Sequence, residues 1–150
     1  MSQHGAARNR EIVERYFEQM RTGAPEIEAL FSEEACWVAP QSSPVGRRHE
    51  GKAAVLALMG SGISLYDRSR PMELQIESMA AEGDRVFVEM TIEATTAGGE
   101  PYRNHYVFVF RLQEEKIVEI REHLDTLYAQ HMLFDPIGPA RASEAEEEEG

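Results

Sequence analysis

Four segments with strand character fill the second half of the chain, and only short turn sequences separate them. The segments run over residues 72–79, 85–95, 102–112 and 116–125. The breaks between them are rich in turn formers and charges: Glu82-Gly83-Asp84, Ala97-Gly98-Gly99-Glu100 and Gln113-Glu114-Glu115. Turns this short join antiparallel neighbours, because parallel strands need a crossover of a dozen residues or more. The spacing therefore predicts an antiparallel meander.

The first half of the chain has helical periodicity instead. A helix is expected between an N-cap at Asn9 and a stop at Gly23, where apolar residues recur at helical spacing: Ile12, Val13, Tyr16, Phe17 and Met20. Further short elements are expected as a helix from Pro25 to Phe31, a strand over 35–38, a helix beginning at Lys52 and a closing helix over 127–134. Residues 40–50 have loop composition. Helices followed by a run of strands indicate an α+β fold.

Composition limits the classes of partner. With 150 residues, 42% of them hydrophobic, the chain suffices for one domain with a real core. We expect that domain to span 9–134, between a flexible 1–8 and an acidic, disordered tail over 135–150. A net charge of −12 disfavours nucleic acid and anionic membranes and leaves small molecules. The single cysteine, Cys36, excludes a disulfide framework, and with no targeting signal or apolar run of spanning length a cytoplasmic location is expected.

One carboxylate interrupts an apolar stripe on the last strand. Strict alternation puts Val118, Ile120, Glu122 and Leu124 on one face. A buried carboxyl must be paired, kept partly wet, or held with a raised pKa, as a general acid or base would be. Glu122 is therefore the leading candidate for a catalytic residue.

The preceding strand carries an aromatic face that can meet this carboxyl. Alternation groups Tyr102, Asn104, Tyr106, Phe108, Phe110 and Leu112 on one side. Because the two strands are hairpin partners, Asn104, Tyr106 and Glu122 could meet over one concave surface. A carboxyl, an amide and a phenol suit cofactor-free proton transfer, in which the donors stabilise an enolate or alkoxide. The competing interpretation is structural: the carboxylate pairs with an arginine, and each tyrosine hydroxyl satisfies a backbone group.

Other polar residues are expected to be structural. The face with Glu119, Arg121, His123 and Asp125 is expected to be solvated or an interface, and His105 to be a surface or dimer-contact residue. Tyr16 and Trp37 favour core positions, although a first-helix tyrosine can point into a cavity. The histidines lack metal-ligand spacing, so no metal is expected.

The order of elements, with Tyr102-Arg103-Asn104-His105-Tyr106 leading to Arg121-Glu122-His123-Leu124-Asp125, resembles SnoaL-like proteins of the nuclear transport factor 2-like superfamily. The resemblance spans roughly residues 9–134. Relatives include ketosteroid isomerase, polyketide cyclases, limonene epoxide hydrolase and phenazine-biosynthesis proteins. It implies a curved antiparallel sheet wrapped by N-terminal helices into a cone, the cystatin-like fold, with an apolar pocket and a homodimer formed through the outer sheet face.

The resemblance also assigns residues. Glu122 takes the place of the catalytic Asp of the epoxide hydrolase and the catalytic Glu of the phenazine proteins. Glu89 and Thr91 take the places of that hydrolase's Arg and second Asp, which would put them in the pocket, whereas patterning alone puts Glu89 outside. Because these two residues differ from the hydrolase pair, epoxide hydrolysis is the least favoured activity.

Against ketosteroid isomerase, Tyr16 resembles the oxyanion-hole tyrosine. Ala39 and Phe108 stand where that enzyme has its base and its protonated Asp, so steroid isomerisation by that mechanism is disfavoured.

The resulting prediction is a cofactor-free acid/base enzyme that cyclises, isomerises or dehydrates an apolar carbonyl compound. The rival is a non-catalytic ligand-binding or dimerisation module. Glu122 would move the proton, with Asn104, Tyr106 and Tyr16 around the oxygen and Asp125 as a second-choice carboxyl if a bulge shifts the register. The expected substrate-binding residues are Trp37, Glu89, Thr91, Tyr102, Phe108, Ile120 and Leu124.

Overall fold

The computed structural model describes residues 3–136 of the chain. Its elements in chain order are α1 (Gln3–Thr22), a 3-10 helix η1 (Pro25–Leu30), β1 (Phe31–Val38), β2 (Arg48–Glu50), α2 (Lys52–Ile63), β3 (Glu73–Glu82), β4 (Arg85–Thr95), β5 (Pro101–Gln113), β6 (Lys116–Leu124), α3 (Thr126–Ala129) and a π-helical turn η2 (Gln130–Phe134). Most of the predicted acidic tail lies outside the described residues.

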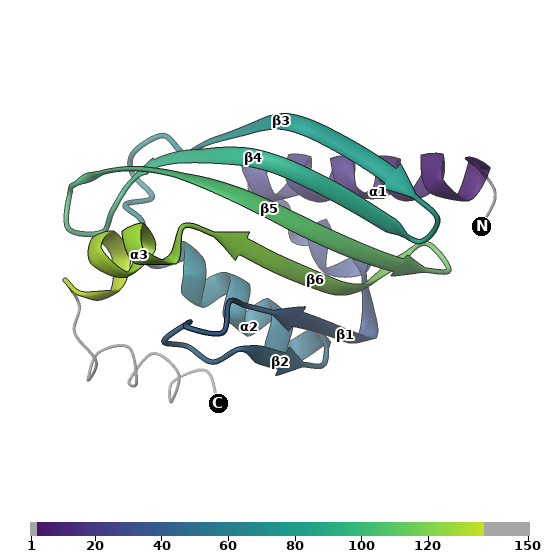
Figure 1. Cartoon of the computed structure of the whole chain (residues 1–150), viewed down its shortest axis with the longest axis horizontal. Helices are drawn as coiled ribbons and strands as arrows, with labels where there is room; N and C mark the ends of the chain where they lie inside the picture. Colours follow the sequence, from purple (N-terminus) through teal and green to yellow (C-terminus); the bar gives the residue numbers. More distant parts are fainter. Residues whose placement is uncertain (1–2, 137–150) are drawn as a thin grey trace.

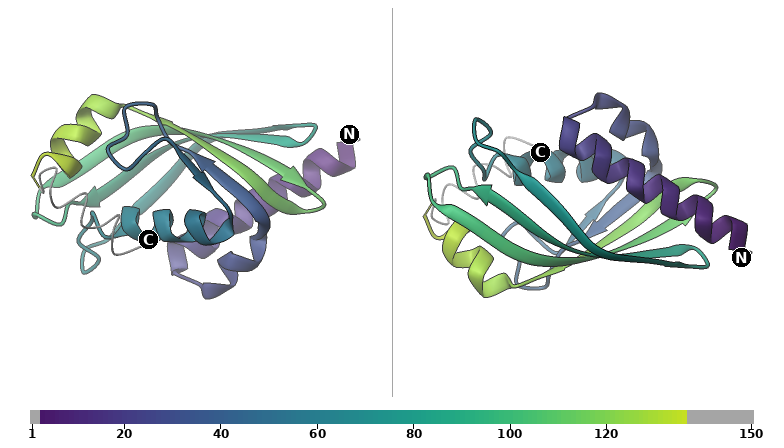
Figure 2. Two further views of the ribbon diagram at one scale, coloured as in Figure 1. Left: turned by 90° about the horizontal axis from the view of Figure 1, so that it is seen from below. Right: turned by 90° about the horizontal axis from the view of Figure 1, so that it is seen from above.

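One curved sheet organises the molecule. Its strand order is β2-β1-β6-β5-β4-β3, and β3 to β6 form the predicted antiparallel meander (Figure 1). The strand β1 adds to the meander through a parallel pairing with β6, and the short β2 lies in the stretch expected to be a loop. Both long helices lie on the same side of the sheet (Figure 2). The predicted α+β class and wrapped, curved sheet are confirmed.

The first helix starts earlier than its sequence signals suggest. It begins at Gln3, so residues 3–8 are helical and Asn9 is not its N-cap. The side chain of Asn9 is buried and donates to the carbonyl of Gly83, 3.3 Å away in the β3–β4 turn. The end of the helix is as predicted. Gly23 has a φ of +70°, and the next amide, of Ala24, returns to the carbonyl of Gln19 at 3.0 Å, which closes the last turn.

The core fills the space between the sheet and α1. Tyr16 and Phe17 of α1 meet Phe110 of β5 edge-to-face, with ring centroids 5.1 and 5.6 Å apart. Phe110 is fully buried, and each such side chain contributes roughly 2–3 kcal/mol through the apolar surface it removes from water. The predicted aromatic face of β5 is confirmed, because alternate residues from Tyr102 to Leu112 are buried.

A β-bulge in β6 changes the face of one predicted residue. Arg111 pairs with Glu119 but its neighbour Leu112 pairs with Ile117, which leaves Val118 as the extra residue. Ile117 is therefore fully buried and Val118 only partly so. The prediction that Val118 shares the face of Glu122 is wrong, because alternation assumes a regular strand.

Candidate active site

Glu122 lies on the inner face of β6 in apolar surroundings. It is directly opposite Phe108 of β5, and Ile120 and Leu124 flank it along the strand. Trp37 of β1 donates its indole N–H to Oε1 of Glu122 at 3.4 Å. Within residues 3–136 no salt bridge reaches this carboxyl, so the sequence-based hypothesis that an arginine pairs with it is not realised there.

This environment changes the acidity of Glu122. Burial raises the pKa of the carboxyl from its ordinary 4.5 to about 7, and the hydrogen bond from Trp37 opposes the rise. Desolvation penalises the charged form, and a donor stabilises it. A carboxyl that titrates near neutral pH can both accept and return a proton, which a general acid/base needs.

A cleft opens beside this carboxyl. Its volume is about 620 Å³, and it lies between two segments of chain: residues 38–42 with Arg47, and residues 121–124 with Thr126. Glu122 is the only carboxylate in this lining. Solvent and small molecules can therefore reach the candidate base from the cleft, while its other neighbours remain apolar.

A cluster of buried tyrosines lies farther along the aromatic face. The hydroxyls of Tyr102 and Tyr106 are 2.6 Å apart, and the ring of Tyr66 packs on that of Tyr102 with the centroids 5.5 Å apart. Burial raises the pKa of Tyr66 and of Tyr106, and the charge of Glu122 adds to the rise at Tyr66. The sequence analysis missed Tyr66, which follows α2 in an irregular segment. No periodic pattern marks it, and only its bridge to Thr96 brings it to the sheet.

The side chain of Asn104 is fully occupied inside this cluster. Its Nδ2 donates to the hydroxyl of Tyr102 at 3.0 Å and to the carbonyl of Asp125 at 3.1 Å. Its Oδ1 accepts from the backbone of His105 at 2.8 Å. An amide has only two N–H donors, so Asn104 has none left for a substrate oxygen. The predicted contact of Asn104 Nδ2 with a substrate oxygen would require one of these hydrogen bonds to break.

Tyr16 and the aromatic wall lie where the sequence places them. Tyr16 is fully buried, and its pKa is raised by burial and by the charge of Glu122, so the two side chains lie close enough to interact. The rings of Trp37 and Phe108 meet edge-to-face at 6.2 Å, and Tyr106 stacks on Phe108 at 5.6 Å. Ile120 is fully buried and lies opposite Phe110 of β5.

The SnoaL-like domain family matches residues 13–120 of the chain. The chain belongs to the SnoaL-like domain family. No curated protein sequence matches it.

Solved structures of the same fold agree with this membership. A nuclear transport factor 2-like protein from Burkholderia xenovorans LB400 is 24% identical, with a TM-score of 0.70 over 85% of this chain and 97% of that one. A candidate SnoaL-like polyketide cyclase from Jannaschia sp. CCS1 is 18% identical, with a TM-score of 0.73 over 85% and 92%. TerC, co-crystallised with polyporic acid, is 20% identical, with a TM-score of 0.74 over 84% and 98%. These likenesses establish the fold.

Asp125 of this SnoaL-like chain is a helix cap. Its carboxylate accepts from the backbone N–H of Tyr128 at 3.1 Å, at the start of α3. The bulge of β6 lies at Val118, before Glu122, so it does not turn Asp125 inward. Asp125 is exposed, and the second-choice catalytic role is not supported by its position.

Glu119 is the buried member of a face predicted to be solvated or an interface, on which His123 and Asp125 are exposed. It is 6% exposed on the outer side of β6, where its Oε1 accepts from Nε of Arg121 at 2.8 Å. Its Oε2 lies 3.8 Å from the thiol of Cys36. Burial would raise the pKa of this carboxyl, but the hydrogen bond and charge of Arg121 outweigh it, and the pKa is lowered.

Glu89 and Thr91 lie on the outer face of the sheet, away from the helices. Thr91 pairs with His105 in the β4–β5 ladder, opposite in parity to the buried Tyr106. The pocket positions implied by resemblance are therefore wrong, and the patterning argument for Glu89 is confirmed. Strand alternation decides the outcome, because Val88 and Met90 already take the inner face.

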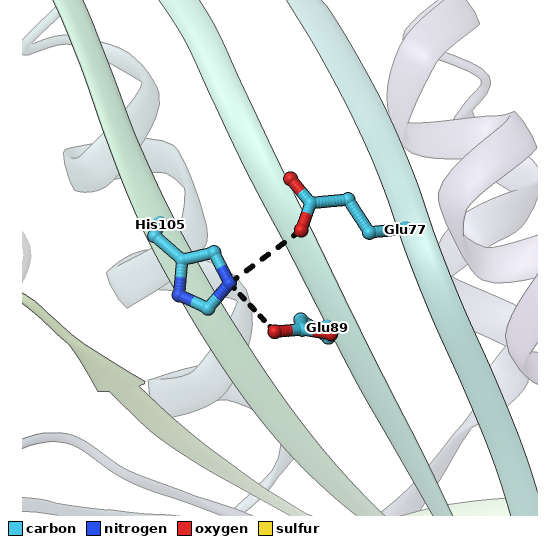
Figure 3. A group of neighbouring side chains, drawn as sticks. All are labelled: Glu77, Glu89 and His105. Carbon is cyan, nitrogen blue, oxygen red and sulfur yellow. Dashed lines mark hydrogen bonds and ion pairs between the residues drawn. The ribbon is translucent and has the colours of Figure 1, made fainter.

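A second cluster of ionisable side chains results on this outer face (Figure 3). His105 Nε2 lies 3.0 Å from Glu89 and 3.7 Å from Glu77, and ligand atoms of all three fall within 4.8 Å of one another. Glu77 is the extra residue of a bulge in β3 and directly precedes Ser78, which pairs with Glu89. Among the described residues this is the group whose ligand atoms lie close enough together to hold a cation.

None of the helices described is long and apolar enough to cross a membrane.

Proposed function

We propose that the chain is a cofactor-free acid/base enzyme that cyclises, isomerises or dehydrates an apolar carbonyl compound, with Glu122 as the catalytic residue. The observation that carries the proposal is the position of this carboxyl. It lies on an apolar sheet face, bound only by Trp37 among the described residues, and it opens onto a cleft of about 620 Å³. Its pKa of about 7 supports the same role.

The reaction follows from this placement. In its ionised form Glu122 removes a proton from the carbon next to the substrate carbonyl, and the C–H electron pair moves into an enolate. The resulting carboxylic acid returns the proton to another carbon for isomerisation. For dehydration, the enolate electron pair expels a hydroxyl group, which takes the proton from Glu122 and leaves as water. For cyclisation, the enolate carbon attacks a second carbonyl of the same molecule, and the alkoxide that forms takes the proton from Glu122. Tyr16 and Tyr66 are the phenols whose pKa responds to the charge of Glu122, so either can supply the donor that stabilises the enolate oxygen.

A second candidate function is ligand binding without catalysis. It is favoured by the occupied polar groups: Asn104 has no free donor, and Tyr102 and Tyr106 bond to each other. The structural neighbour TerC, co-crystallised with polyporic acid, supports the ability of this fold to hold a ligand.

The family expectation of a homodimer also remains a proposal. The outer sheet face exposes 41% of Phe87, beside the partly buried Val107 and Val109. Light scattering of the purified chain measures its mass directly. A monomer at micromolar concentration would contradict the dimer.

The decisive experiment combines a carbon-13 NMR titration of the glutamate carboxyls with turnover assays. Glu122→Gln assigns the Glu122 signal, and Glu119→Gln, on the same strand but the opposite face, is the matched control. We expect Glu122 to titrate near pH 7 and its variant to lose a factor of about 100 or more in kcat/KM on a panel of cyclic ketones and polyketide-like diketones, with Glu119→Gln active. An ordinary pKa, or undiminished turnover in Glu122→Gln, would reject the catalytic role.

A further inference from the structure

Arg47 lies in register with the candidate active site. In the β1–β2 hairpin Trp37 pairs with His49 and Val38 with Arg48. The ladder continues one residue further, because the amide of Ala39 donates to the carbonyl of Arg47 at 2.6 Å. Directly opposed residues project from the same face of a sheet. Arg47 therefore belongs to the face of Trp37, which is the face of Glu122.

The same row reaches β6. Trp37 pairs with Ile120 and Val38 with Arg121, so the register continued by one residue sets Glu122 beside Ala39. Arg47, Ala39 and Glu122 thus form a row across adjacent strands, with the backbones of the outer two about 10 Å apart. All three line the cleft, and the small side chain of Ala39 leaves space between the other two.

The charge of Arg47 is unopposed within residues 3–136. Neighbouring arginines are engaged: Arg48 pairs with Glu50, and Arg121 donates to Glu119 at 2.8 Å. Arg47 has no side-chain hydrogen bond or ion pair to any described residue. In a chain of net charge −12, a free guanidinium at the mouth of a cleft makes one place where an anion is attracted rather than repelled.

We propose that Arg47 binds a carboxylate of the ligand, so that the ligand is an apolar or aromatic carboxylic acid whose far end reaches Glu122. This inference rests on the proposed site at Glu122 and names its substrate class. The planar guanidinium offers paired N–H donors that match the two oxygens of a carboxylate. The row fixes the distance between the two functional ends of the ligand, and Ala39 and Leu124 of the cleft lining contact its apolar body.

The test uses two probes that differ only in charge, 4-phenylbutanoate and 4-phenylbutanamide. Trp37 is the only tryptophan of the chain and touches Glu122, so its fluorescence reports occupancy of the cleft. We expect the full chain to bind the acid about tenfold more tightly than the amide. Arg47→Ala should remove that preference and leave amide binding unchanged, and Arg47→Lys should restore part of it. Arg15→Ala, which removes an exposed charge from α1, should change neither affinity.

Three results would overturn the inference: equal affinity for the two probes, an equal loss of both affinities in Arg47→Ala, or no response of Trp37 to either probe at millimolar concentration. Glu122→Gln separates this inference from the proposed function. A binding preference that survives in Glu122→Gln, together with no turnover by the unmodified chain, would support the Arg47 site while rejecting catalysis. Turnover by the unmodified chain, together with equal affinity for the acid and the amide, would retain catalysis and reject the carboxylate site.

Discussion

Glu119 and Glu122 lie on the same strand and are both substantially buried, but their pKa values are shifted in opposite directions. Glu119, on the outer face, has a lowered pKa because Arg121 donates to it at 2.8 Å, with Arg111 and Arg48 adding to the effect. Glu122, on the inner face, has only the indole of Trp37 at 3.4 Å, and its pKa rises to about 7. Glu122 is the more strongly desolvated of the two, and it lacks the cation that Glu119 has. Together these differences make one glutamate a structural ion pair and the other a candidate base.

Replacing each carboxyl by its amide should sharpen the contrast most. The folded pKa of Glu122 lies above its unfolded value, so between about pH 4.5 and pH 7 the folded chain keeps a proton that the unfolded chain has released, and stability falls as pH rises through that window. Glu122→Gln should therefore stabilise the chain at pH 8 by up to about 3 kcal/mol, measured by urea unfolding. Glu119→Gln should destabilise it, because the stability from a lowered pKa is present at pH 8. Equal signs for the two variants would refute the comparison.

Removing the cation should make Glu119 resemble Glu122. Arg121→Met leaves Glu119 buried without its main partner, and we expect a loss of about 2 kcal/mol at neutral pH, reduced from the full cost of an orphaned charge because Arg111 and Arg48 remain. The pKa of Glu119 should rise in the carbon-13 titration. Stability that is unchanged, with an unmoved Glu119 signal, would show that Arg121 is not the cause.

The turn that joins β5 to β6 offers a control for general stabilisation. Glu114 and Glu115 both have positive φ, 51° and 65°, a conformation that Asn-Gly adopts with less strain. Replacing the pair by Asn-Gly should raise unfolding free energy by about 1 kcal/mol. The pKa values of Glu119 and Glu122 should stay where they are, since neither residue contacts the turn. A coupled change would mean that both acidities depend on the hairpin as a whole.

The smallest expected effect is at Trp37. Trp37→Phe removes the hydrogen bond that lowers the pKa of Glu122, so the pKa of this carboxyl should rise further above 7. Chemical shift against pH, with Glu122→Gln for assignment, measures the change. A downward move would show that water replaces the indole and hydrates the carboxyl.

The sequence was informative wherever periodicity decides the structure. Alternation correctly predicted that every second residue from Tyr102 to Leu112 is buried and that Glu89 lies on the outer face, and the turn sequences correctly located the meander. The single carboxyl in an otherwise apolar stripe made Glu122 the leading candidate for a catalytic residue from the sequence alone.

What escaped prediction depends on contacts between distant segments. The bulge at Val118 follows from how β5 and β6 fit together, and no local signal announces it. The sequence predicts a loop around Arg47, which directly precedes β2, because β2 forms only when β1 is present to pair with it. The position of Tyr66 and the full use of the two Asn104 N–H donors depend on contacts between residues far apart in the chain.

The parallel pairing of β1 with β6 sets the order in which this molecule can be made. The hydrogen bond from Trp37 to Glu122 joins residues separated by 85 positions, so forming it closes a far longer loop than any hairpin of the meander does. Closing such a long loop is slow relative to forming hairpins. During synthesis the meander hairpins can therefore assemble first, and the candidate catalytic carboxyl acquires its neighbours only in the final step of folding.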